Sequence, residues 1–237
     1  MSGMYPATNG KPVFHEFITP IGLFCHLYHD KPSAKTDRMG QPELDKDTGL
    51  PLAEFKATLA WDKTRIAELE QIIALANQAK AEAWPQSVGP NAFFALEPFF
   101  RDGDNPAHNT KGKEYLFGKY YLNFKQKAIA SRDPQTGQIT YTGAPGLLGP
   151  YGPEDKIMPI DVYAGCTGRV SGVIFATTYM GKNFITTRLN NIQKYEDGER
   201  IGGGTRPSAG EQFGALKTGG TQSGLGGLGS ITGNKMI

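Results

Sequence analysis

Short runs rich in β-branched and aromatic residues recur along this chain, and glycine and proline separate them, which favours strands joined by turns. Glycine occurs 31 times and proline 16 times in 237 residues, which is high for a helical protein. The pattern therefore predicts a mainly β fold. The runs that we assign to strands are residues 13–29, 55–61, 115–130, 138–141, 161–180 and 183–195.

One segment has the period of a helix instead. Its apolar residues recur at spacings of three and four, at Ile66, Leu69, Ile73 and Ala76. Asp62 or Thr64 can cap the start of this segment, and Trp84-Pro85 ends the pattern. The sequence thus predicts one amphipathic helix over about residues 62–84.

Composition divides the chain into three parts. Residues 1–12 lack any periodicity and are expected to form a flexible N-terminal arm. Residues 13–203 hold all the strand and helix patterns and are expected to form one domain, with long loops at 30–53 and 143–159. Residues 204–237 are glycine-rich and of low complexity, so we expect a disordered tail, because such a segment buries too little apolar area to offset its ordering entropy.

The chain has no run of roughly 18 apolar residues that could cross a membrane, and its start lacks a signal-peptide pattern. Its two cysteines, Cys25 and Cys166, lie far apart and outside any CxxC spacing, as is typical of buried reduced thiols. We therefore expect a soluble protein in the cytoplasm.

Positive charge is concentrated on the aromatic strands. Residues 111–132 hold six basic residues and one acid, and no acid lies between Asp161 and Glu196. The whole chain, by contrast, has 25 basic and 23 acidic residues. Single-stranded nucleic acids are bound by this pairing, since cations follow phosphates and aromatic rings stack on bases of any identity.

Strand geometry adds to this argument. Alternation places Lys119, Tyr121 and Asn123 on one face of their strand and Tyr120 and Phe124 on the other, so both faces cannot be core. Trp61 and Trp84, which flank the helix, are expected in the core. The residues that we predict to bind the nucleic acid are Lys119, Tyr121, Phe124, Lys125, Lys127, Tyr163, Arg169, Tyr179, Lys182 and Arg188.

Other groups of residues are weaker candidates for a functional site. Cys25-His26, His29 and His15 are metal-ligand types, but alternate strand residues point to opposite faces, so we expect no metal site. Asp102 and Asp104 could hold a divalent ion as in a nuclease, yet their Asp-Gly-Asp-Asn-Pro context is ordinary turn chemistry. The chain offers no convincing nucleophile or base, so we expect no enzymatic activity and no cofactor.

Four segments together resemble a family of phage proteins that includes OB-fold single-stranded-DNA-binding proteins. They are RDGD (Arg101–Asp104), YYLNFKQKA (Tyr120–Ala128), YAGCTGRVSGVIFA (Tyr163–Ala176) and LNNIQKYEDGERIGG (Leu189–Gly203). The resemblance runs over roughly residues 13–213. It implies a five-stranded OB-fold barrel with extra elements, on whose face aromatic and basic side chains hold single-stranded DNA.

The resemblance also implies a role in replication, recombination or repair of phage DNA in the host cytoplasm. It leaves open phage or host replication proteins as partners, and self-association along DNA. Many single-stranded-DNA-binding proteins end in an acidic tail that recruits partners, whereas the tail of this chain has one acid, Glu211. The main alternative is a β-rich virion or tail component, which would also explain the glycine content and the tail.

Overall fold

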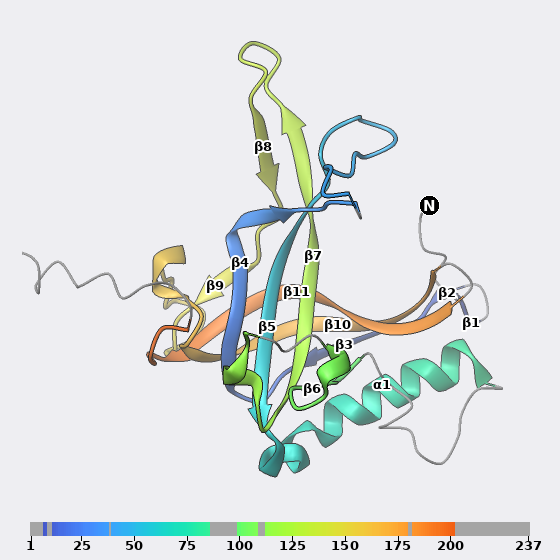
Figure 1. Cartoon of the computed structure of the whole chain (residues 1–237), viewed down its shortest axis with the longest axis vertical. Coiled ribbons are helices and arrows are strands. Elements are labelled where there is room, and N and C mark those ends of the chain that lie inside the picture. The colour runs from blue at the N-terminus through green and yellow to red at the C-terminus, as the bar shows by residue number, and fades with distance from the viewer. Residues whose placement is uncertain are drawn as a thin grey trace, which may run out of the picture. The chain divides into compact units, whose positions relative to one another are not determined.

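The computed structural model describes residues 7–8, 11–37, 39–85, 99–108, 112–179 and 182–201, and these are drawn in colour in Figure 1. The predicted tail lies outside the described residues. So does most of the predicted N-terminal arm, whose described part consists of two short antiparallel strands. These are β1 (Ala7–Thr8) and β2 (Lys11–Pro12).

Five strands of the main sheet close into a ring (Figure 1). In order around the ring they are β4 (Gly22–Ala34), β5 (Ala53–Asp62), β7 (Lys119–Arg132), β11 (Lys182–Glu196) and β10 (Thr167–Tyr179). The pairs β4–β5, β5–β7 and β10–β11 are antiparallel over long registers.

Two short pairings complete this ring. Arg188 of β11 lies opposite Lys125 of the parallel strand β7, and Thr167 of β10 lies opposite Leu23 of β4. A five-stranded, partly open barrel is the OB-fold architecture. The predicted mainly β, OB-type fold is therefore confirmed, although the short closures make the barrel irregular.

Four shorter strands extend the ring. β3 (Phe14–Ile18) pairs with β10, β6 (Arg101–Asp102) and β8 (Ile139–Thr142) pair with β7, and β9 (Gly146–Leu148) pairs with β11.

Two predicted strand starts were placed too early. Glu114–Leu116 and Pro159–Asp161 form 3-10 turns, so β7 begins only at Lys119 and β10 only at Thr167. Gly118 ends the first turn with a φ of 71°, a conformation that glycine adopts without strain. Local aromatic content favoured strand at both places, and the turn geometry overrode it.

The inward faces of the ring strands form the main hydrophobic core. Phe24, Leu59, Leu122, Phe124, Ile174 and Leu189 are all fully buried there. Trp61 is also buried, and its indole N–H donates to the carbonyl of Pro20 at 3.4 Å, while Trp84 is partly buried against the same core. The prediction that both tryptophans belong to the core is confirmed.

The predicted helix is present but begins differently. A 3-10 segment, η1 (Lys63–Leu69), precedes α1 (Glu70–Ala83), and Arg65 within η1 has non-helical dihedral angles. Asp62 does not cap the segment, because its carboxylate accepts a hydrogen bond from Lys119 Nζ at 2.6 Å. The break shifts the phase of the apolar stripe, so Ile72, Ala76 and Ala79 are buried and Ile66 is exposed.

The helix packs against β10 and β3. Figure 1 shows α1 running beside β3 and β10 and not across β4, β5 or β7. The outer face of β4–β5–β7 is thus not covered by α1. No helix in the described part of the chain is both long enough and apolar enough to cross a membrane.

Candidate nucleic-acid interface

The outer face of the sheet β4–β5–β7 carries polar and basic side chains, because the inward positions of these strands are apolar. Along β7, Leu122 and Phe124 point into the core, whereas Lys125 lies on the other face and is exposed. The predicted division of the β7 residues between two faces is therefore confirmed.

Three cations lie side by side across this face. Lys56 of β5 is directly opposite Lys125 of β7, and Lys125 is opposite Arg188 of β11. Paired residues on neighbouring strands project to the same side of the sheet, and strands lie about 4.8 Å apart. These three residues, here called the basic row, therefore present a line of positive charge across three strands.

One carboxylate lies among these cations. Glu54 is 3.7 Å from Lys56, 3.9 Å from Lys125 and 3.4 Å from Lys35, measured from carboxylate oxygen to ammonium nitrogen. Arg188, at the other end of the basic row, has no ion-pair partner among the described residues. Lys35 also lies 3.9 Å from Glu43, so two carboxylates face these three lysines, and with Arg188 the area keeps an excess of positive charge.

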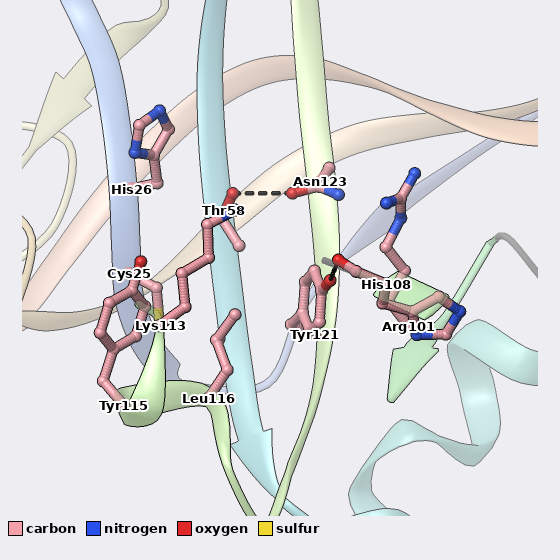
Figure 2. Close-up of a pocket in the computed structure, with 10 residues that line it drawn as sticks. All are labelled: Cys25, His26, Thr58, Arg101, His108, Lys113, Tyr115, Leu116, Tyr121 and Asn123. Atoms are coloured by element: carbon pink, nitrogen blue, oxygen red, sulfur yellow. Dashed lines mark hydrogen bonds between the residues drawn. The ribbon is translucent and has the colours of Figure 1, made fainter. Parts of the chain in front are cut away.

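A pocket of about 150 Å³ lies on the same face, at the end of the sheet nearest β6 (Figure 2). We call it the outer-face pocket. Three sheet strands supply Cys25, His26, Thr58, Tyr121 and Asn123, and the segments beside them supply Arg101, His108, Lys113, Tyr115 and Leu116. None of these ten described residues is acidic, so the pocket is basic and aromatic in character.

The RDGD segment holds one wall of this pocket in place. Asp104 accepts a hydrogen bond from the backbone N–H of Gly118 at 2.9 Å, and Lys63 Nζ lies 2.7 Å from both Asp102 and Asp104. A side chain at Gly103 would collide with the carbonyl of Leu116. The predicted turn is confirmed, and its two aspartates are bound to a lysine.

Hydrogen bonds fix the floor of the outer-face pocket. The Thr58 hydroxyl donates to the side-chain oxygen of Asn123 at 2.7 Å, and the Tyr121 hydroxyl donates to the carbonyl of His108 at 3.4 Å (Figure 2). Thr187 of β11 donates to the backbone carbonyl of Asn123 at 2.7 Å. Asn123 is therefore held from both neighbouring strands.

Burial shifts the pKa values of three groups in the pocket, and for Tyr115 it raises the pKa above its usual value. Burial raises the pKa of Cys25 to about 12, so its thiol stays protonated and is a poor nucleophile near neutral pH. Burial, and then the charges of Lys113 and Lys56, lower the pKa of His26 below its usual value, so the imidazole is neutral near pH 7.

The structure places the predicted basic residues in different settings. Lys125 and Arg188 belong to the basic row, and Lys127 extends from the same face but pairs with Asp45 at 3.1 Å. Lys119 pairs with Asp62. Arg169 lies in a separate pocket on β10 and β11, where its Nε donates to Gln193 at 2.8 Å.

The predicted aromatic residues divide differently. Phe124 is completely buried and packs on Phe17, with ring centroids 6.1 Å apart, so it belongs to the core and not to the surface that we had predicted for it. Tyr121 is 4% exposed and forms part of the pocket wall. Tyr163 donates to Asp197 at 2.7 Å and is covered by the Arg200 guanidinium, 3.8 Å from its ring centre.

The side chains of Tyr179 and Lys182 lie outside the described residues, although their backbones end β10 and begin β11. Sequence reasoning missed several residues of this face, namely Lys56, His26, Arg101 and Lys113. Lys56 gave a signal, since it is a polar residue within the alternation of β5. The other three join the face only through the tertiary structure.

The candidate metal ligands do not form a site. His29 Nε2 lies 2.9 Å from the carbonyl of Pro159, and His15 pairs with Glu82 at 3.2 Å, while Cys25 lies in the outer-face pocket. In the described part of the chain, no three His, Cys, Asp or Glu side chains come together as a metal site would require. Both cysteines are buried and free, as predicted.

Comparison with protein families identifies the chain. Residues 53–222 match the family described as Enterobacter phage Enc34, ssDNA-binding protein. The chain belongs to this family. The match covers four of the five ring strands, all except β4. It also includes all four segments that carried the resemblance, so the predicted family is confirmed.

Solved structures show the same fold. The single-stranded DNA-binding protein from bacteriophage Enc34 in complex with ssDNA superposes with a TM-score of 0.51 and 16% identity, over 79% of this chain and 89% of that chain. A C-terminal truncation of the same protein gives 0.50 and 16%, over 78% and 88%. No curated protein sequence matches the chain. Membership of a phage DNA-binding family does not favour the virion-component alternative.

Proposed function

We propose that this phage-family protein binds single-stranded DNA without strong sequence preference, across the outer face of β4, β5 and β7. The observation that carries the proposal is membership of the Enc34 ssDNA-binding family over residues 53–222. The outer face of β4–β5–β7 supports it, because an OB-fold binds oligonucleotides on this part of its barrel.

The basic row supplies the electrostatic part of the binding. Lys56, Lys125 and Arg188 lie at one level across three strands, so a strand crossing the sheet there would pass its phosphates over them. Lys127 extends this charge along β7. Lys119 forms an ion pair with Asp62 at the end of β5, so it is a weaker candidate for contact with DNA.

Aromatic contacts would come from the outer-face pocket and from β10–β11. Tyr121 is buried and offers little ring surface to a base, whereas His26 and Tyr28 form an exposed edge-to-face pair with centroids 4.8 Å apart. The path of the bound strand would continue over β10 and β11. The residues that would contact it there are Tyr163 with Arg200, Arg169, and Tyr179 and Lys182 at the ends of the two strands. Stacking reads a π-face that every base has, so such contacts are tolerant of sequence.

We also propose that the protein acts by binding rather than by catalysis, in the cytoplasm of the host cell, during replication, recombination or repair of phage DNA. Proteins of these processes, or further copies of the chain along the strand, are its proposed partners.

A direct test is titration of a fluorescently labelled single-stranded oligonucleotide with the full chain at several salt concentrations. We expect the logarithm of the affinity to fall linearly with the logarithm of salt, with a slope of about −0.7 per phosphate neutralised. Homopolymers of different bases should bind within about tenfold of one another. Retention that does not change with salt, or binding to double-stranded DNA of equal strength, would contradict the proposal.

A further inference from the structure

The outer-face pocket contains a hydrogen-bond donor that the protein itself leaves unused. The side-chain oxygen of Asn123 accepts from Thr58, which orients the amide and turns its NH₂ group away from β5 (Figure 2). That nitrogen has no hydrogen-bond partner among the described residues, nor is it among the buried polar atoms that lack one. The amide NH₂ is therefore an accessible donor held in a fixed direction.

Asn123 is held by both neighbouring strands, its side chain from β5 and its backbone from β11. Thr58 is 9% exposed, and its hydroxyl lies on the strand directly opposite Asn123. Thr187 donates to the backbone carbonyl of Asn123 from the other side. With the amide oxygen turned to the Thr58 hydroxyl, the NH₂ group faces away from β5 and is the donor that the pocket presents.

The volume of the pocket selects a ring of limited size. It measures about 150 Å³. A cavity of about this volume in another protein holds one benzene ring. A six-membered ring therefore fits within the pocket, whereas a fused purine would have to leave one of its rings outside.

The rest of the lining suits a nucleotide. His26 and Tyr115 provide aromatic surface, and His26 is neutral near pH 7, so it can lie against a base without carrying charge. Arg101 and Lys113 have no ion-pair partner within the described residues, and both line the pocket. Two unneutralised cations beside an aromatic recess are what a base with its flanking phosphates requires.

We propose that the outer-face pocket holds one pyrimidine base of the bound strand, with the Asn123 amide donating to a carbonyl oxygen of that base. Thymine and cytosine are single six-membered rings, and both carry a carbonyl oxygen on the ring. Arg101 and Lys113 neutralise the phosphates on either side. This inference rests on the proposed function, since it assigns one subsite of the same DNA-binding face.

The test compares oligo(dT) and oligo(dA) of equal length on the full-length protein, its Asn123→Ala variant and its Thr58→Val variant. Single-stranded oligo(dA) stacks on itself and weakens binding to any protein equally, so the change in the affinity ratio between proteins is the informative quantity. We expect the ratio of dT to dA affinity to fall about three- to tenfold in Asn123→Ala, the value of one hydrogen bond. Thr58→Val, which releases the amide, should reduce the ratio in the same direction by a smaller factor.

Lys125→Ala is the matched control, because Lys125 lies two residues further along β7, on the same face of the strand and outside the pocket. It should weaken binding to both oligonucleotides alike and leave the ratio unchanged. A ratio that is the same in wild type and in both pocket variants, with tight binding retained, would overturn the pocket assignment and leave the proposed function intact. Absence of single-stranded DNA binding by the wild type would instead overturn the proposed function, and the pocket with it.

Discussion

Removal of two neighbouring members of the basic row should separate a role in DNA binding from a role in the fold. The perturbation is the pair Lys125→Ala and Arg188→Ala, singly and together. The two residues are directly opposite one another on parallel strands, and paired like charges at such positions destabilise a sheet. Their loss should therefore leave the free energy of unfolding within about 0.5 kcal/mol of wild type, or raise it slightly.

The effect on binding follows from counterion release. Each phosphate contact contributes a slope of about −0.7 in single-stranded DNA, so the double variant should lose about 1.4 from the salt slope. Between about 50 and 200 mM salt, the affinity of the wild type should then fall about sevenfold more than that of the double variant. Arg188→Ala should have the larger single effect, because Lys125 already lies 3.9 Å from Glu54.

The assay is fluorescence polarisation of a labelled oligo(dT) across a salt series, with a thermal melt of each variant. Lys80→Ala is the control, since Lys80 lies on α1, which packs against β10 and β3. An unchanged slope in the double variant, together with a lower melting temperature, would refute the reasoning and assign both cations to the fold.

Four further changes have defined outcomes. Phe124→Ala should lower the free energy of unfolding by about 3–5 kcal/mol in a denaturant titration, because the Phe124 ring is fully buried, and should leave the DNA affinity of the folded protein unchanged. Loss of binding without loss of stability would contradict the assignment of Phe124 to the core. Glu54→Gln should raise low-salt affinity about threefold by freeing Lys56 and Lys125 for phosphates, and weaker binding would mean that Glu54 positions these lysines. Binding should tighten as the pH falls below the usual pKa of histidine, because phosphates of the bound strand raise the lowered pKa of His26, and His26→Ala should abolish this trend. The free protein should lose stability over the same acidic range, because its folded state binds a proton at His26 less readily than the unfolded chain does. Thermal melts at several pH values measure this loss. Deletion of residues 204–237 should leave the melting temperature unchanged, because the described cores lie between Val13 and Ile201, and an early melt would show that the tail packs.

Local sequence patterns were sufficient to predict the class of fold and the chemistry of the surface. The alternation in residues 55–61 and 119–127 decides which side chains share a face, since the side-chain period of a strand is two whatever the partner. The helix was also located from sequence. So was the break between the runs at 115–130 and 138–141, where Asp133 accepts the backbone N–H groups of Gln135 and Thr136 in a turn. These features depend on neighbours within a few residues.

Which face points inward could not be read in the same way. Tyr121 and Phe124 are both aromatic residues of one basic strand, and only the packing of β7 against Phe17 of β3 places Phe124 in the main core. Ring chemistry alone does not distinguish a stacking residue from a core residue. Burial depends on the opposing strands, which come from distant parts of the chain.

The sequence by itself determined that the chain is mainly β, that its positive charge lies on aromatic strands, and that one helix follows residue 62, because periodicity and composition are local properties. The tertiary structure alone decided that Lys56, Lys125 and Arg188 form one row, and that Arg101 and Lys113 close a pocket against His26 and Asn123. The physical reason is register: residues 69 and 63 positions apart become neighbours only when the strands pair. A shift of one residue in any of these pairings would turn the same side chains to the opposite face.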